Sequence, residues 1–173
     1  MKFQNIIFAI LISLLAFGSI QAVAQEHKSY TGSEAFERVK TLVGSWKGTM
    51  DAGPETITAS YKLTAADSAI VETVFEGTPH EMMSVYHDDS NRLLTMTHYC
   101  AEHNQPKMTL TGMAHNRLTL DLSKDSDIDV ARETHIHSFT ILFDGDDKMT
   151  QQWVSFENGK EKQVVEIAYQ RVR

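Results

Sequence analysis

Residues 133–149 read ETHIHSFTILFDGDDKM, and this stretch decides the fold. From residue 133 to residue 143 every second side chain lies on one side of an extended chain, and this series ends in Phe139, Ile141 and Phe143. Alternation with this period predicts a β-strand with one buried face. Residues 144–147 then form a short turn signal, so the next strand, near residues 148–156, is predicted to run antiparallel to the first.

The same alternation recurs from residue 44 to the end of the chain, and turn residues separate its segments. It predicts about nine or ten strands, near residues 44–51, 55–65, 68–77, 81–88, 92–100, 106–113, 116–122, 132–143, 148–156 and 161–172. The gaps have hairpin length and hold no crossover helix, which indicates an antiparallel arrangement. An up-and-down barrel is favoured because closure removes the exposed edges of an open sheet, and a two-sheet sandwich is the alternative.

Alternation groups the side chains of a strand without showing which group faces the lumen. The groups are Ile57-Ala59-Tyr61-Leu63, Ala69-Val71-Thr73-Phe75, Met83-Val85, Leu94-Met96-His98-Cys100, Leu118-Leu120-Leu122 and Val165-Ile167-Tyr169. In residues 133–143 the aromatic and aliphatic members mark the inward side. His135 and His137 share that side, so both are predicted to be luminal.

A short helix is predicted before the first strand. Thr31-Gly-Ser-Glu34 matches a capping box, and Phe36, Val39 and Leu42 follow at helical spacing. The helix is expected to end before Gly44.

The N-terminal residues 1–24 have the pattern of a cleaved secretory signal: a basic start, an apolar run and an Ala22-Val23-Ala24 cleavage site. The alternative is an uncleaved anchor, but the run of about 15 residues is shorter than the ~20 that a membrane span needs. We therefore expect an exported protein, periplasmic or secreted, with a flexible lead-in at residues 25–31, one domain at residues 32–173 and no stable membrane insertion after cleavage.

The charge balance excludes some partners. The chain has 16 basic and 23 acidic residues, a net charge of −7, and loss of Lys2 with the signal leaves 15 against 23, or −8. Binding of nucleic acid or of an anionic membrane needs clustered basic residues, which this sequence lacks. No nucleic-acid partner is expected.

Gly44-Ser45-Trp46 opens the first strand after the short helix, and Arg171 lies near the end of the last strand. This arrangement resembles the G-x-W signature of lipocalin-like (calycin) barrels, in which an Arg packs against the Trp and closes the barrel. The stretches at residues 77–83 and 97–108 are similar to a group of secreted bacterial lipocalin-like proteins of unassigned function. The resemblance spans residues 32–173, but the chain lacks the disulfide pair of typical lipocalins because Cys100 is its only cysteine.

The segment from His98 to Met108 is dense in hydrogen-bonding side chains where a plain hairpin would need only Asn or Gly, so it is expected at a pocket rim. We predict a small hydrophobic or amphipathic ligand in a partly polar lumen. The predicted pocket residues are His98, Cys100, His103, Asn104, Gln105, His135, His137 and Trp153.

Two other classes of function stay open. His135 and His137 with His98 form a candidate metal set, which Cys100, His103, Glu72 or Glu81 would complete. The resemblance to nitrobindin-like haem barrels makes the same two late histidines candidate haem ligands. We expect no resident cofactor, with zinc or haem as the alternatives.

A catalytic interpretation would have Cys100 activated by His98 or His103, but no cysteine-hydrolase signature surrounds it. We therefore expect a binding protein rather than an enzyme. A structural or partner-binding domain with a packed lumen is the remaining hypothesis.

Overall fold

The computed structural model describes residues 29–50 and 56–173, so the predicted signal peptide and residues 25–28 of the lead-in lie outside the described residues. Within them the chain forms one helix and ten strands. Their bounds are α1 (Glu34–Lys40), β1 (Gly44–Met50), β2 (Thr56–Thr64), β3 (Ala69–Val74), β4 (Met82–Asp88), β5 (Leu94–Tyr99), β6 (Lys107–Ala114), β7 (Arg117–Leu122), β8 (His135–Asp144), β9 (Lys148–Glu157) and β10 (Lys160–Arg171).

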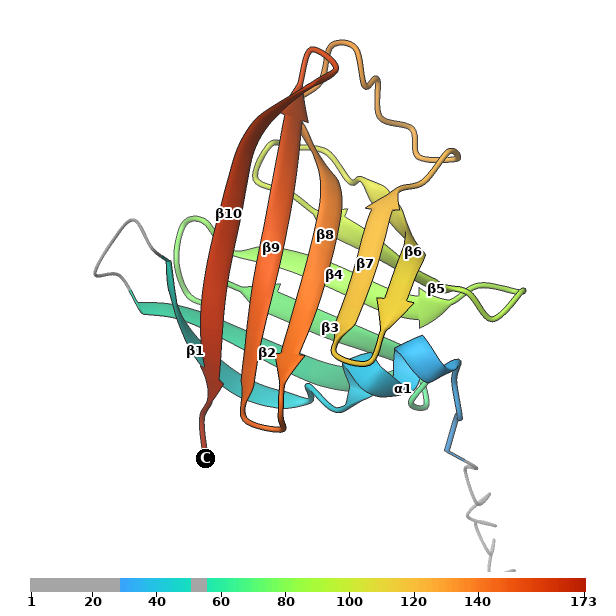
Figure 1. Ribbon diagram of the computed structural model, residues 1–173, viewed down its shortest axis with the longest axis vertical. Coiled ribbons are helices and arrows are strands. Elements are labelled where there is room, and N and C mark those ends of the chain that lie inside the picture. The colour runs from blue at the N-terminus through green and yellow to red at the C-terminus, as the bar shows by residue number, and fades with distance from the viewer. Residues whose placement is uncertain (1–28, 51–55) are drawn as a thin grey trace, which may run out of the picture.

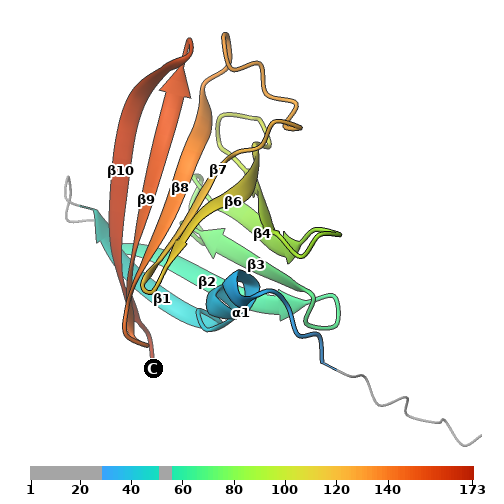
Figure 2. The same cartoon turned by 45° about the vertical axis from the view of Figure 1, so that its right-hand side comes forward.

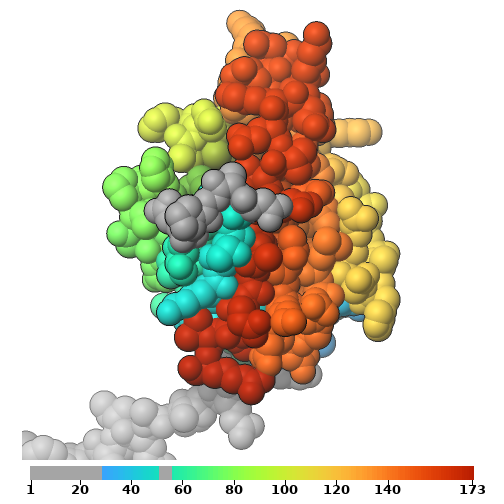
Figure 3. All heavy atoms as spheres, turned by 60° about the vertical axis from the view of Figure 1, so that its left-hand side comes forward, coloured from blue at the N-terminus to red at the C-terminus, as the bar shows by residue number. Residues whose placement is uncertain are grey.

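Each strand pairs antiparallel with the next one in sequence, and β1 pairs with β10 to close the barrel (Figure 1). The predicted up-and-down barrel is confirmed, and the two-sheet sandwich is wrong. Closure leaves no strand edge unpaired along the wall, which is the physical advantage that favoured this topology over an open sheet. In the space-filling view the side chains of β10 and β9 form a continuous surface beside those of β1 (Figure 3).

The lumen-facing side chains follow the predicted groups in β2, β7 and β10, and also in β5, where Leu94, Met96 and His98 are buried. In β3 and β4 the group opposite to the one grouped from sequence faces inward, with Ile70, Glu72 and Val74 buried in β3 and Ser84 and Tyr86 in β4. Met83, on the other face of β4, is 36% exposed. The lumen therefore contains a polar level between apolar residues.

The helix α1 covers one end of the barrel, and the β9–β10 hairpin projects at the other end (Figure 2). The buried side chains of α1, Phe36 and Val39, belong to the hydrophobic core of the barrel. The N-cap is Ser33, whose Oγ accepts a hydrogen bond from the Phe36 backbone N–H at 3.1 Å, so the predicted capping box at Thr31 is wrong. Glu37 instead accepts from the backbone N–H of Gly32 at 2.7 Å, and this bond lowers the pKa of Glu37.

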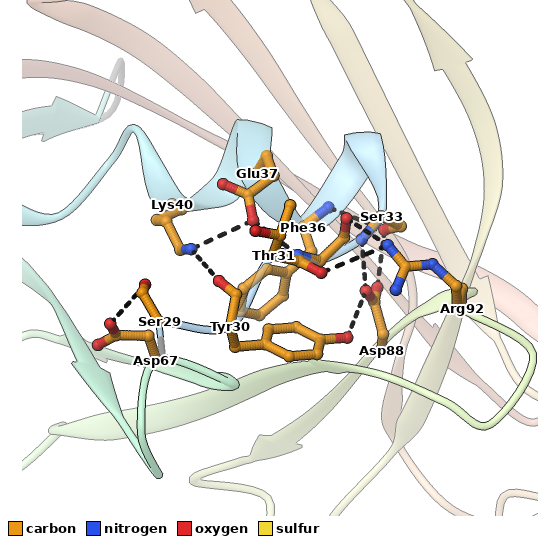
Figure 4. Close-up of polar contacts among 11 residues, drawn as sticks. Ser29, Tyr30, Thr31, Ser33, Phe36, Glu37, Lys40, Asp67, Asp88 and Arg92 are labelled. Carbon is orange, nitrogen blue, oxygen red and sulfur yellow. Dashed lines mark hydrogen bonds and ion pairs between the residues drawn. The ribbon is translucent and has the colours of Figure 1, made fainter. Parts of the chain in front are cut away.

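Polar contacts fix the start of α1 to the strand ends around it (Figure 4). Asp88, the last residue of β4, accepts hydrogen bonds from the Tyr30 hydroxyl at 3.1 Å and from the Ser33 hydroxyl at 2.7 Å. Arg92, in the β4–β5 turn, donates to the Gly32 carbonyl at 2.6 Å. These bonds hold α1 over the end of the barrel, so that end is closed to a ligand.

Trp46 and Arg171 close the same end. The Arg171 guanidinium carbon lies 4.2 Å from the centre of the Trp46 ring, and Trp46 Nε1 donates to the Leu42 carbonyl at 2.8 Å. Arg171 also donates to the carbonyls of Thr41 and Val43 at 2.7 and 2.9 Å. One side chain thus links the last strand to the segment between α1 and β1. Among the described residues, no helix has the length and apolar character that a membrane crossing requires.

Candidate functional site

A cavity of about 280 Å³ lies in the lumen at the strand ends away from α1. Its wall is mostly apolar and comes from β1, β3, β4, β9 and β10, with Met50, Val74, Phe75, Met82, Val165 and Ile167 among the lining residues. The polar contributions come from His98, Glu102, Thr134, His135, Ser155 and Gln163. The volume is close to the lower limit of ~300 Å³ usual for small-molecule sites.

His98 and Trp153 pack against each other in this wall, with ring centres 4.8 Å apart. Trp153 also packs on Phe139 at 4.1 Å, so the three rings fix one another. His98 is 1% exposed, and burial lowers its pKa to about 4. The imidazole is therefore neutral at physiological pH and offers one donor and one acceptor nitrogen.

A row of polar side chains crosses four neighbouring strands at one level of the lumen. Tyr61 of β2 is the register partner of Glu72 in β3, which is the partner of Ser84 in β4, and Ser84 is the partner of His98 in β5. Hydrogen bonds link the ends of this row. The Tyr61 hydroxyl donates to Glu72 Oε1 at 2.6 Å, and Ser84 Oγ lies 3.0 Å from His98 Nδ1.

Further donors converge on the Glu72 carboxyl from other strands. The Tyr86 hydroxyl donates to Oε2 at 2.6 Å, and the Gln151 amide donates to Oε1. Trp153 Nε1 donates to Gln151 Oε1 at 3.1 Å, which turns the amide nitrogen of Gln151 toward Glu72. A carboxyl surrounded by donors is arranged to accept, which suits its ionised form.

Opposing effects set the proton affinity of this buried group. The pKa of Glu72 is raised above its usual value, because burial outweighs the lowering effect of the hydrogen bonds from Tyr61, Tyr86 and Gln151. Burial and the Glu72 charge raise the pKa values of Tyr61 and Tyr86, so both tyrosines remain donors. Within the described residues no Lys or Arg forms an ion pair with Glu72. The charge is stabilised by neutral dipoles alone.

The hydroxyl of Tyr169 is another buried polar group near Glu72. This hydroxyl makes no hydrogen bond to a described residue, and burial followed by the Glu72 charge raises its pKa. The Tyr169 ring lies over Gly48, its register partner in β1. A Cβ at Gly48 would be 2.6 Å from the ring, so only glycine allows this approach.

The two late histidines lie next to each other. His135 Nε2 is 3.2 Å from His137 Nδ1, and the His137 ring stacks on Phe156 at 3.9 Å. His135 is fully buried and contributes to the cavity wall, whereas His137 is not among its lining residues. The register shifts between Ile136 and Ser138, so a bulge interrupts the strict alternation predicted for β8. Burial, followed by the charge of His135, lowers the pKa of His137.

The segment between β5 and β6 supplies part of the cavity rim. Cys100 lines the cavity, and burial raises the pKa of its thiol. Asn104 is buried and donates to the Thr134 carbonyl at 2.8 Å, tying this loop to the start of β8, while its Oδ1 has no partner among the described residues. His103 and Gln105 are exposed and are not in the cavity wall. Cys100 is therefore a rim residue, and Asn104 supports the rim.

The ring nitrogens of the candidate metal ligands contact other groups of the protein. His135 Nδ1 lies 2.8 Å from the Glu133 carbonyl and Nε2 lies 3.2 Å from His137 Nδ1, so both nitrogens of His135 are engaged. His98 faces Ser84 instead of joining them. In the part of the chain that the structure describes, no three His, Cys, Asp or Glu side chains come together as a metal site requires.

Sequence reasoning included His98 and Trp153 but missed the polar level next to them. The sequence offers Glu72 only as a carboxylate for a metal set, and it does not single out Tyr61, Ser84 or Gln151 as site residues. A weak signal was present, because Glu72 and Ser84 each lie in the middle of a strand. The register that joins them arises only in the folded barrel.

Comparison with known proteins supports the fold and no more. No protein-family model matches the sequence, and no curated protein matches it significantly. Among solved structures, the crystal structure of Rv2717c from M. tuberculosis is similar, with a TM-score of 0.54 and 11% sequence identity. The similarity covers 83% of this chain and all of that chain. At this identity the likeness shows a shared barrel architecture.

Proposed function

We propose that this protein is an exported, lipocalin-like barrel that binds a small, mainly apolar molecule in the lumen. The observation that carries the proposal is the cavity of about 280 Å³ with apolar walls and the buried His98 beside Trp153. An apolar pocket with a few fixed polar groups is the usual form of a small-molecule site, in which apolar contact supplies affinity and the polar groups fix orientation. The small volume favours a ligand about the size of one ring.

Trp153 offers a direct reporter of binding. The chain has two tryptophans, and Trp46 lies at the closed end of the barrel. In a Trp46→Phe background the fluorescence comes from Trp153 alone. Titration with a panel of single-ring compounds that includes cyclohexylmethanol is expected to give a saturable change in emission. If no compound of the panel gives one, the proposal is wrong.

Two neighbouring residues of β10 provide a matched test of where the ligand lies. Val165 lines the cavity, whereas Val164 is 43% exposed on the other face. Val165→Phe fills the cavity and is expected to weaken binding at least about tenfold, while Val164→Phe leaves it unchanged. Equal effects of the two substitutions would place the ligand elsewhere.

Export is the second part of the proposal and rests on the N-terminal sequence. Expression of the full chain in a bacterium is expected to give a periplasmic or secreted protein that begins at Gln25, as read by N-terminal sequencing. A cytoplasmic product that retains Met1 would contradict export. The binding measurements above do not depend on this result.

A further inference from the structure

The cavity wall has an uneven distribution of charge. Its described lining residues include Glu102 and the neutral His98, and they include no Lys or Arg. An anionic ligand would therefore meet no opposite charge, and it would lie close to the row that contains the buried Glu72. A buried anion needs a paired charge or several donors, which this wall does not provide. The cavity thus disfavours carboxylates and phosphates.

The polar row also engages one ring nitrogen of His98. Ser84 Oγ lies 3.0 Å from His98 Nδ1, which leaves Nε2 as the ring nitrogen for a ligand in the cavity. Because burial lowers the pKa of His98 to about 4, the ring is neutral at physiological pH. His98 therefore adds no positive charge that would repel a cation.

The carboxyl of Glu72, at the centre of the row, adds a negative charge. Glu72 accepts from Tyr61, Tyr86 and Gln151, and a neutral carboxyl would have to turn its own proton against one of these donors. The donors therefore favour the carboxylate. In a poorly solvated lumen its field extends to the cavity with less screening than at the surface. This field attracts a positively charged group.

We propose that the cavity selects an organic cation, a primary ammonium group on a small apolar body, with the ammonium beside His98 on the side of Glu72 and the body against Trp153. This inference rests on the proposed ligand-binding function. The aromatic faces around the site also suit a cation. The net charge of the chain, −7, favours the approach of cations from solution.

Three compounds with the same ring test the inference: cyclohexylmethylamine, cyclohexylmethanol and cyclohexanecarboxylate. At neutral pH the first is a cation, the second neutral and the third an anion. The fluorescence of Trp153 measures the dissociation constant of each. We expect the amine to bind at least about tenfold more tightly than the alcohol, and the carboxylate to bind most weakly.

The outcomes separate this inference from the function on which it rests. If the alcohol or the carboxylate binds as tightly as the amine, the cation preference is overturned and ligand binding stands. If none of the three binds, both proposals are overturned. This ranking is measured on a protein with an unaltered cavity, so it does not depend on whether any cavity variant folds.

Two Glu→Gln substitutions identify the source of the preference. Glu72→Gln removes the buried charge and keeps the side-chain shape, so the preference for the amine over the alcohol is expected to fall to about threefold or less. Glu102→Gln removes an exposed rim charge, which solvent screens, and is expected to change the preference by less than about twofold. Unchanged affinity for the alcohol shows that the cavity is intact. A full amine preference in folded Glu72→Gln would overturn the role of the carboxylate.

Discussion

Replacing Arg171 by Ala should lower the stability of the protein strongly, although Arg171 lies near the end of the chain. Its guanidinium donates to three backbone carbonyls, those of Thr41, Val43 and Asp146, at 2.7 to 2.9 Å, and lies 4.2 Å from the centre of the Trp46 ring. The side chain is 19% exposed, so water only partly replaces these contacts. They join β10 to the segment before β1, which is where the barrel closes.

The contacts give the magnitude. Hydrogen bonds from a charged donor are worth about 1.5–3 kcal/mol each, and we take about 1 kcal/mol because the group is partly solvated and the three bonds are coupled. The cation–π contact adds about 0.5–1 kcal/mol. Arg171→Ala should therefore lower the free energy of unfolding by about 3–4 kcal/mol. Arg171→Lys keeps the charge but not the planar set of donors, and should cost about 1–2 kcal/mol.

Urea unfolding followed by far-UV circular dichroism measures these differences as shifts of the midpoint at constant slope. Arg173→Ala is the control, because Arg173 is 80% exposed and its side chain pairs with Asp147 alone. Its loss should stay below about 0.5 kcal/mol. An Arg171→Ala loss below about 1 kcal/mol, or an Arg171→Lys protein as stable as the original, would refute the argument.

Three further predictions concern packing, capping and titration. Gly48→Ala should lower the free energy of unfolding by about 1–3 kcal/mol because the new methyl group meets the ring packed on it, whereas Gly112→Ala, with its nearest neighbour at 3.5 Å, should cost less than about 1 kcal/mol in the same urea assay. Ser33→Ala should cost about 1 kcal/mol through loss of the N-cap, and Thr31→Ala should be neutral; the opposite order in thermal melts would restore the capping box predicted from sequence. In an NMR titration the ring of His98 should protonate near pH 4. Because this pKa lies below the 6.5 of an unfolded histidine, the neutral ring stabilises the fold above pH 6.5, and this contribution is lost as the pH falls toward 4; a midpoint near 6.5 would show a solvated ring.

The strands and their order were predictable because their causes are local. Side chains alternate with a period of two whatever the rest of the chain does, and turn residues such as Gly145 and Gly159, which have φ values of +69° and +71°, mark the hairpins. An open sheet of these strands would leave two unpaired edges, and this favours closure into a barrel. The Trp46 and Arg171 pair was also predictable, but through its resemblance to a known family and not through physics.

The faces of β3 and β4 were not predictable in the same way. In β3 Glu72 shares the buried face with Ile70 and Val74, whereas Val71 lies on the other face. Tyr61, Tyr86 and Gln151, all on other strands, supply the donors that make the burial of Glu72 tolerable. No single strand contains that information.

The sequence by itself determined a barrel of alternating strands, a short helix before the first strand and, through a family resemblance, the Trp and Arg that close one end. Only the tertiary structure decided that Tyr61, Glu72, Ser84 and His98 form one row and that His137 leaves the cavity wall. Alternation is a property of each strand, whereas a row across strands depends on the register between them, and register is set when all ten strands close together. The candidate site is therefore a product of closure.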